Sequence, residues 1–537
     1  DLSGLQAVAL LFLGAIIGET IMIFFHYYLT MAVAQRCLAD LRVEIFSHVQ
    51  KLPMAYFDRN PVGRLVTRMT TDVDVLQEMF SSGVMTLISD FVMVVWIVGI
   101  MFYLHAELAL VSLALIPPMA LAINFFRIKA RQTYRLIRER IARINAYLGE
   151  AISGMAIIQL FAREEKTYRE FDEINAAHRD AYHLSNLYEA ALYSMVAAAG
   201  SVSVALLLWY RDGEVLHGII GIGTVVAFKE YIHRFFVPLR DFSQKYAVMQ
   251  SAMSSAERIF QLLDTPVTID SPKKPVIPKP FRGEVVFDDV WFHYKADDPV
   301  LKGVSFRIEP GEKIAVVGAT GSGKTTTIKL LTRFYDVQKG SIQVSGVDVR
   351  EWDLQALRRH IGVVLQDVFL FSGDIRANLA LGDRSVRLER IENAARLANA
   401  DTFIQRLAGG FSADVRERGS NFSGGQRQLL ALARVLVFQP EILVMDEATS
   451  SVDTETEALI QDALERVMRD RTCLLIAHRL STIRNADRII VLHRGEVREI
   501  GSHSQLMEKQ GIYHRLYQLQ YEREELRVPV QEAEPKL

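Results

Sequence analysis

Hydrophobic positions are unevenly distributed along the 537-residue chain. Long apolar runs occupy the part before about residue 240. After about residue 265, short apolar stretches alternate with charged ones, as in an ordinary soluble α/β domain. A chain of this length is too long for one hydrophobic core. We therefore predict a helical membrane part followed by a separate α/β domain.

A helix that crosses a bilayer needs about 20 mostly apolar residues. Tight turns near His105 and Asp212 are expected to join neighbouring spans, whereas the other links are long and helical in pattern. This pattern predicts an all-α transmembrane bundle with long cytoplasmic extensions. Five stretches qualify as spans, at about 5–33, 79–104, 106–126, 188–210 and 216–238.

The charge of the links predicts their side of the membrane. Eleven Lys and Arg residues lie between Arg127 and Arg179, and positive charge marks cytoplasmic loops. Both long links, 36–78 and 127–187, are therefore expected in the cytoplasm. Five spans between a cytoplasmic C-terminal domain and Asp1 place Asp1 on the opposite side. We expect that a first helix is missing from this sequence.

The long links carry a pattern of their own. Residues 36–52 continue the first span as an amphipathic helix, with a turn at Asn60-Pro61 and a short helix after it. A second break is predicted at Gly154. Such arms extend well beyond the bilayer at 1.5 Å per residue, and short helices at their tips could press on a soluble domain. The alternative is that these links are solvated loops.

Charged residues inside spans are costly and usually face a cavity or a partner. They are candidates for substrate contacts, but an interhelical ion pair or a position at the membrane edge explains each equally well. The candidates are Glu19, Asp90, Lys229 and Glu230.

Net charge and cysteine content exclude several classes of function. The net charge of −2 includes no basic stretch, so nucleic acid is not an expected partner. Cys37 and Cys473 are far apart and lack neighbouring ligands, which predicts inert thiols rather than a disulfide or metal site.

The boundary between the two predicted domains is marked by five prolines within residues 263–282, which predict an extended, unpacked linker. The predicted boundaries are a transmembrane domain at 1–262, a linker at 263–282, a nucleotide-binding domain at 283–522 and a flexible tail at 523–537.

A phosphate-binding loop follows the predicted buried strand Ile314–Val317. The segment matches G-x-x-x-x-G-K-[ST] in the strand–loop–helix context that this motif requires. Its glycines let backbone N–H groups surround phosphates at a helix N-terminus, the lysine reaches the terminal phosphates, and Thr325 offers its hydroxyl to Mg²⁺. The candidate ATP-binding residues here are Gly318, Ala319, Thr320, Gly321, Ser322, Gly323, Lys324, Thr325 and Thr326.

A second predicted strand, Ile442–Met445, ends in two acids. Asp446 can hold Mg²⁺ directly or through water, and Glu447 can act as general base on the attacking water. An apolar run that ends in two acids is a weak signal alone, but it becomes strong beside a phosphate loop. Together they predict an ATP hydrolase.

Between these two motifs stands NFSGGQRQLLALARVL at 421–436, which resembles the signature segment of ABC ATPases. In that family its helix N-terminus binds the γ-phosphate of ATP held by the opposing subunit. Phe422 replaces the usual leucine, which we interpret as a change of packing only. The resemblance implies ATP-binding roles for Ser423, Gly424, Gly425 and Gln426.

Other segments resemble the same family in the expected order. Tyr294 resembles the aromatic residue that stacks on adenine, although packing in the core is the alternative for a single aromatic residue. Gln366 resembles the glutamine that senses Mg²⁺ and the attacking water, and His478 the switch histidine. The resemblance also implies a helical subdomain at about 367–440 inserted into a sheet-based core.

Nearly the whole chain resembles a half-transporter of the ABC exporter branch. It is most like bacterial multidrug and lipid exporters, particularly the multidrug-like kind that pairs as heterodimers. The resemblance implies ATP and Mg²⁺ as cofactors, a second half-transporter as partner in a homodimer or heterodimer, and contact with membrane lipid. It further implies export of a small amphipathic substrate across the bacterial inner membrane, with the ATPase domain in the cytoplasm. A gated channel, a soluble ATPase acting on nucleic acid, and an importer on the same scaffold are the alternatives.

Overall fold

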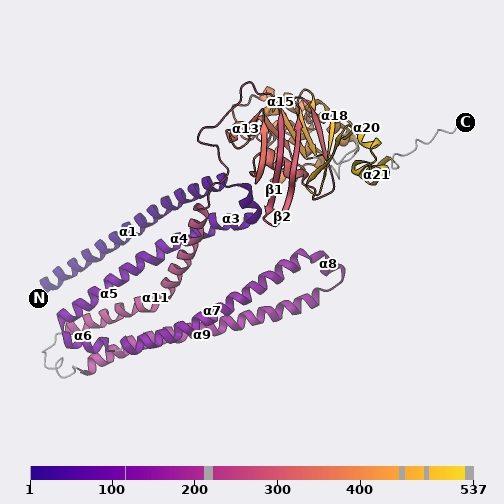
Figure 1. The fold of residues 1–537 in the computed structure, drawn as a ribbon. Helices are drawn as coiled ribbons and strands as arrows, with labels where there is room; N and C mark the ends of the chain where they lie inside the picture. Colours follow the sequence, from indigo (N-terminus) through magenta and orange to yellow (C-terminus); the bar gives the residue numbers. More distant parts are fainter. Residues whose placement is uncertain (1, 115, 211–221, 447–453, 477–482, 526–537) are drawn as a thin grey trace. The chain divides into compact units, whose positions relative to one another are not determined.

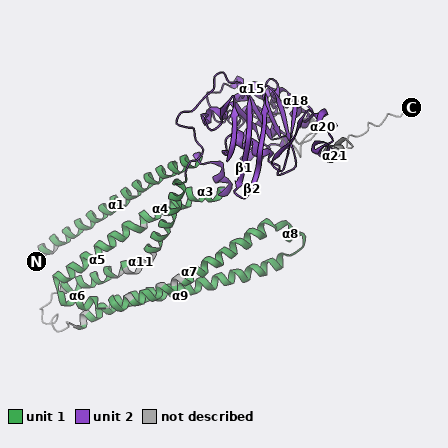
Figure 2. Cartoon of the chain, viewed as in Figure 1, with its two compact units in different colours: residues 1–50, 62–265 green, residues 51–61, 266–537 purple. Residues whose placement is uncertain are grey.

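The computed structural model describes residues 2–114, 116–210, 222–446, 454–476 and 483–525. The chain divides into two compact units (Figure 2). Unit 1 comprises residues 1–50 and 62–265, and unit 2 comprises residues 51–61 and 266–537. A short segment from the first long link thus belongs to the C-terminal unit.

Unit 1 is built from helices, several of them far longer than a bilayer is thick (Figure 1). They form because apolar and helix-favouring residues run for tens of positions with few breakers. The helices are α1 (Leu2–Lys51), α3 (Val62–Met69), α4 (Thr71–Glu78), the π-helix η1 (Met79–Gly83), α5 (Val84–Leu104), α6 (Ala106–Leu113), α7 (Ile116–Ser153), α8 (Met155–Leu160), α9 (Glu164–Tyr210) and α11 (Ile222–Leu263).

Four stretches of the described residues are long and apolar enough to cross a membrane. They confirm apolar helices over four of the five predicted spans. The fifth, at 216–238, lies partly outside the described residues, and its span remains a prediction. The four stretches are Gln6–Lys51, Val62–Leu104, Ala106–Phe126 and Glu164–Leu206.

The predicted breaks occur where the sequence places them. α1 runs without interruption through 36–51, a short helix ends at Arg59 before Asn60-Pro61, and α8 begins just after Gly154. Over the stretch 106–126, α6 covers Ala106–Leu113 and α7 begins at Ile116. The two prolines at 117 and 118 lie in the first turn of α7, where proline fits because the first N–H groups of a helix have no partner within it.

The described part of unit 1 has one apolar core cluster and an ion pair whose carboxylate is buried. The cluster gathers side chains such as Met101, Leu108 and Phe228, which come from α5, α6 and α11. In the ion pair, Arg258 of α11 donates from Nε to Asp72 of α4 at 3.0 Å, and Ser255 donates to the same carboxylate at 3.0 Å. This pair ties α4 to the last long helix, α11.

The described residues of unit 2 form three sheets. A four-stranded sheet has the order β2-β1-β4-β5, a six-stranded sheet has the order β12-β11-β3-β10-β9-β6, and β7 pairs with β8. The strands are β1 (Val285–Lys295), β2 (Asp298–Ile308), β3 (Lys313–Val317), β4 (Lys339–Val344), β5 (Val347–Asp348), β6 (Ile361–Val364), β7 (Gly373–Asp374), β8 (Asp414–Val415), β9 (Ile442–Asp446), β10 (Thr472–Ile476), β11 (Arg488–His493) and β12 (Glu496–Gly501).

In the six-stranded sheet, β11, β3, β10, β9 and β6 run parallel. Buried residues fill β3, β9 and β10 almost without interruption, as expected for a parallel sheet covered on both faces. All five strands end at one edge, and ligands of open α/β sheets bind outside that edge.

Helices accompany the sheets of unit 2. The described ones are α2 (Met54–Arg59), α12 (Lys324–Leu331), α13 (Leu354–His360), α14 (Ile375–Ala380), α15 (Leu388–Leu397), α16 (Asp401–Arg406), η2 (Gly410–Ser412), η3 (Glu417–Gly419), α17 (Gly424–Phe438), α18 (Thr454–Met468), α20 (His503–Glu508) and α21 (Ile512–Glu525). Helices α14 to α17 form the inserted helical part and share a core with β9 and β10.

The proline-rich linker corrects one prediction. It carries no helix or long strand, but it is packed against unit 2 rather than free. The Val276 N–H donates to the Glu351 carbonyl at 2.9 Å, and the Phe281 ring stacks on His360 at 4.2 Å. Five prolines leave few backbone donors for regular structure, so side chains and single hydrogen bonds hold the segment in place.

Candidate functional site: a phosphate loop and a signature helix

The phosphate loop connects β3 to α12. Gly318 needs the absence of a side chain, because a Cβ atom there would lie 2.1 Å from the Leu492 carbonyl oxygen. Gly323 has φ +102° at the N-terminal cap of α12, in the region that glycine tolerates best. Lys324 donates from Nζ to the carbonyls of Gly318 and Ala319, at 2.8 and 3.1 Å. The lysine therefore closes the loop on itself with its ammonium group inside the turn.

Lys324 is a buried cation. Burial lowers the pKa of its amine, and the nearby Asp446 carboxylate opposes that effect. A phosphate in the loop supplies the negative charge that this ammonium otherwise lacks. The site is thus electrostatically prepared for an anion.

Two side chains of the predicted Mg²⁺ site, Thr325 and Asp446, lie within hydrogen-bond distance of each other. The Thr325 hydroxyl donates to Asp446 Oδ2 at 3.2 Å, and Asp446 is buried at the end of β9. A hydroxyl and a carboxylate are ligands that Mg²⁺ accepts beside phosphate oxygens. These residues would therefore fit a magnesium ion.

Strand register brings a third predicted residue to the same edge. β6 pairs with β9 so that Val364 faces Met445. Gln366 and Asp446 thus follow the carboxyl ends of adjacent parallel strands, and Gln366 is exposed there. Ile476 at the end of β10 pairs with Asp446 on the other side. Of these residues, Gln366 and Asp446 were predicted from the sequence to belong to one site.

The signature segment forms the N-terminus of α17. Ser423 is the N-cap: its hydroxyl accepts from the Gln426 N–H at 3.2 Å, and the Gln426 side chain accepts from the Ser423 N–H at 3.0 Å. This capping box leaves the hydroxyl proton of Ser423 free to point toward an incoming acceptor. Ser423 and Gly424 are exposed. Phe422 is buried and contacts the Phe403 ring, so it is a packing residue as predicted.

Tyr294 lies in β1 with its side chain half-buried. Its ring contacts Tyr335 edge-on at 5.2 Å, and its hydroxyl lies 3.3 Å from the Thr326 hydroxyl in α12. The Lys329 ammonium lies 5.4 Å from the ring centre. Both alternatives raised for this residue therefore have support, since the ring packs on the core and also borders the helix of the phosphate loop. The sequence reasoning missed Tyr335 and Lys329, because no motif marks them.

The remaining predicted residues are two catalytic candidates and four charged residues of the predicted spans. Glu447 and His478 lie outside the described residues. Asp90 forms an ion pair with Lys245 of α11, and Glu230 forms one with Arg234 at 3.1 Å. The two remaining intramembrane candidates, Glu19 and Lys229, have exposed side chains. For Asp90 the geometry matches the interhelical alternative.

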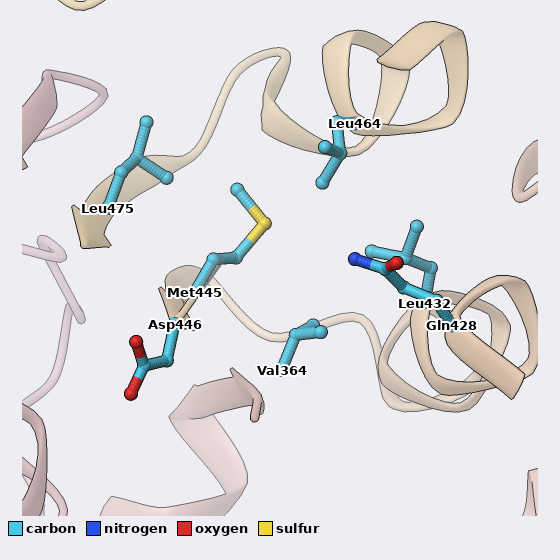
Figure 3. Close-up of a pocket in the computed structure, with 7 residues that line it drawn as sticks. All are labelled: Val364, Gln428, Leu432, Met445, Asp446, Leu464 and Leu475. Carbon is cyan, nitrogen blue, oxygen red and sulfur yellow. The ribbon is translucent and has the colours of Figure 1, made fainter. Parts of the chain in front are cut away.

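A small cavity lies behind the end of β9 (Figure 3). Figure 3 shows the Gln428 amide pointing into it, whereas the Asp446 carboxylate points away. Most of the lining is apolar, which suits neither a nucleotide nor a metal ion. The cavity is therefore distinct from the phosphate site. Its lining residues are Val364, Gln428, Leu432, Met445, Asp446, Leu464 and Leu475.

Comparison with known proteins decides the family. Residues 3–239 match the ABC transporter transmembrane region, and residues 301–450 match the ABC transporter family. A probable multidrug resistance ABC transporter ATP-binding/permease protein of Bacillus subtilis is 38% identical over 525 residues, covering 97% of this chain and 77% of that protein. The chain belongs to the ABC exporter family.

Other members of the family extend this result. An ATP-dependent lipid A-core flippase of Desulfotalea psychrophila is 34% identical over 526 residues, with 97% of this chain and 91% of that protein covered. A bacterial Atm1-family ABC exporter solved with ATP bound has a TM-score of 0.72 at 27% identity, covering 94% of this chain and 87% of that chain. This ABC exporter chain thus fuses a membrane-spanning region to an ATPase domain, and it couples ATP hydrolysis to transport.

Proposed function

We propose that this exporter works as one half of a dimer that clamps ATP·Mg²⁺ between two subunits. The observation that carries the proposal is the contact of the Thr325 hydroxyl with Asp446 at the phosphate loop, 3.2 Å apart. Thr325, Asp446 and Gln366 would hold the metal, and Lys324 would bind the terminal phosphates. When bound, Mg²⁺ would supply screening of the phosphate charge, and the protein residues would orient the nucleotide and water.

The opposing subunit contributes its signature helix. The Ser423 hydroxyl and the first N–H groups of α17 are directed at a γ-phosphate, where helix N-termini favour anions. ATP therefore makes a contact across the dimer that ADP lacks, and this difference in affinity shifts the conformational equilibrium. Glu447 then polarises water, and His478 contacts the γ-phosphate.

Two apolar surfaces support a dimer. α8 exposes Ile157 and Leu160 although it sits on the polar arm of the long hairpin. In the segment after β6, Phe369 and Phe371 are also exposed, with their rings 5.1 Å apart. Exposed apolar patches of this kind mark protein contacts. We assign the α8 face to the partner's ATPase domain, and the phenylalanine pair to the partner's helical arm.

The substrate class follows from the relatives. Curated relatives are described as a multidrug resistance transporter, a lipid A-core flippase and a fatty acid transporter. These cargoes are amphipathic, which agrees with the apolar helices of unit 1. We assign this chain to the outward transport of small amphipathic molecules or lipids across the bacterial plasma membrane, with the ATPase domain in the cytoplasm.

Glu447→Gln tests the catalytic assignment. The glutamine keeps the size and polarity of the side chain but not its basicity. In proteoliposomes we expect unchanged ATP affinity and hydrolysis reduced by at least about a hundredfold, the scale of lost general-base catalysis. Near-normal turnover in a homodimer that carries this substitution in both subunits would overturn the assignment. Native mass spectrometry of the purified complex separates homodimer from heterodimer.

A further inference from the structure

Helix α2 is held by unit 2 although it is flanked by unit 1 in the chain. Residues 51–61 cluster with the ATPase domain. Ala55 packs against the core that underlies β1 and β4, and the Tyr335 hydroxyl donates to the Asp58 carboxylate. None of the six residues of α2 is fully buried. Few buried contacts therefore fix this helix on the domain, and the Tyr335 bond is a polar contact that joins it to the domain.

The other side of Tyr335 faces the suspected adenine site. Its ring contacts the Tyr294 ring edge-on, with the centres 5.2 Å apart and the planes at 89°. The Lys329 ammonium lies 5.4 Å from one ring centre and 5.9 Å from the other. Tyr335 is only 8% exposed. A buried ring that is packed on both sides transmits a displacement because its neighbours leave no space to absorb it.

The protonation of Tyr335 suits a donor role. Burial, together with the Asp58 carboxylate, raises the pKa of the phenol. The hydroxyl therefore keeps its proton throughout the physiological range, and the bond to an ionised carboxylate is of the strong, charge-assisted kind.

We propose that Tyr335 is a positioning residue that ties α2 to Tyr294, so that a nucleotide bound against Tyr294 restrains the tip of the first cytoplasmic arm. Stacking of adenine on the Tyr294 ring restricts the motion of that ring. The Tyr335 ring packs against the edge of Tyr294 and is restricted with it, and the Tyr335 hydroxyl holds the Asp58 carboxylate. The inference rests on the proposed ATP site. It adds a link from the base of the nucleotide, separate from the phosphate contacts that drive closure.

Hydrogen–deuterium exchange of residues 54–60 tests the link in the full-length protein in nanodiscs, with Glu447→Gln to prevent hydrolysis. We expect ATP·Mg²⁺ to slow exchange in α2. Tyr335→Phe keeps the ring but removes the hydroxyl. Without nucleotide it raises exchange of α2 about tenfold, the scale of one lost charge-assisted hydrogen bond, and it abolishes the slowing by ATP. Tyr513→Phe is the matched control, because its hydroxyl bonds His503 at 2.7 Å, far along the chain from α2.

Substitutions of Asp58 sharpen the test. Asp58→Asn retains an acceptor oxygen and is expected to preserve the response to ATP, whereas Asp58→Ala is expected to match Tyr335→Phe. The double variant Asp58→Ala/Tyr335→Phe is expected to be no worse than either single variant, since both remove the same bond.

Three outcomes overturn the link. In the first, Tyr335→Phe raises the exchange of α2 without nucleotide, but ATP still slows that exchange. Tyr335 would then only stabilise the position of α2 and would not link it to the nucleotide. Another is weakened ATP affinity in Tyr335→Phe, which would place the residue in the pocket itself. The third is Asp58→Asn behaving like Asp58→Ala. Failure of the ATP site itself has a different signature, because the chain with Tyr335 intact would then bind no ATP.

Discussion

Replacing Arg258 by methionine is expected to destabilise unit 1 more than replacing its partner Asp72 by asparagine. The two side chains differ in exposure: Asp72 is 7% exposed and Arg258 is 43% exposed. Arg258→Met leaves a buried carboxylate with the Ser255 hydroxyl at 3.0 Å and the weaker charge interaction of Arg68. Breaking a fully buried pair costs about 3–5 kcal/mol, and because Arg258 is partly exposed we expect the lower end of that range.

Asp72→Asn has a smaller expected cost. The guanidinium left behind is partly exposed and can be solvated, so the loss is that of hydrogen bonds to a charged group, about 1.5–3 kcal/mol. The double variant Asp72→Asn/Arg258→Met is expected to be more stable than Arg258→Met alone, because it leaves no buried charge. A double-mutant cycle therefore gives a coupling of at least about 1 kcal/mol.

Thermal unfolding of the full-length protein in nanodiscs, at one fixed scan rate, measures the order of these variants. The exposed pair Arg42–Asp74 lies on α1 and the same helix α4 at 2.7 Å and is the matched control. Its removal is expected to cost only about 0.2–1 kcal/mol. Equal effects of Arg258→Met and Asp72→Asn, or a coupling no larger than the control's, would refute the reasoning from burial.

Three further outcomes are expected. Lys324→Ala weakens ATP binding by at least about tenfold in an equilibrium titration, since it removes the buried cation of the phosphate loop; unchanged affinity would contradict the role. Gly318→Ala also weakens ATP binding and lowers the melting temperature, because its Cβ would lie 2.1 Å from the Leu492 carbonyl oxygen. Burial raises the pKa of the Cys473 thiol to about 12, so at pH 8 only about one molecule in ten thousand holds the thiolate. Maleimide should label it only after denaturation, and rapid labelling of folded protein would show the thiol to be accessible.

Motifs that encode local backbone geometry could be predicted from the sequence. The phosphate loop, the strand that ends in Asp446 and the capped helix after Phe422 each need particular residues at fixed spacing. The helix breaks at Asn60-Pro61 and Gly154 were predictable for the same reason, because glycine and proline act on their own backbone.

Contacts between distant segments could not be predicted in this way. Tyr335 meets Asp58 across 277 positions of the chain, and Arg258 meets Asp72 across 186. Neither pair has a characteristic spacing, so a single sequence carries no signal for it. The packed linker shows the same limit: its prolines predict an extended backbone, but which surface Phe281 stacks on depends on His360 from a different part of the chain.

The length of α9 has a mechanical consequence. Its 47 residues extend about 70 Å at 1.5 Å per residue, and the hydrocarbon core of a bilayer takes up about 30 Å of that. A stiff rod with about 40 Å beyond its pivot magnifies small rotations, so that a tilt of about 10° sweeps its far end through about 7 Å, more than one helical turn. Rigid rotation can therefore couple a displacement of several ångströms at the far end of this arm to a somewhat smaller displacement of the part in lipid, without any helix bending or unwinding.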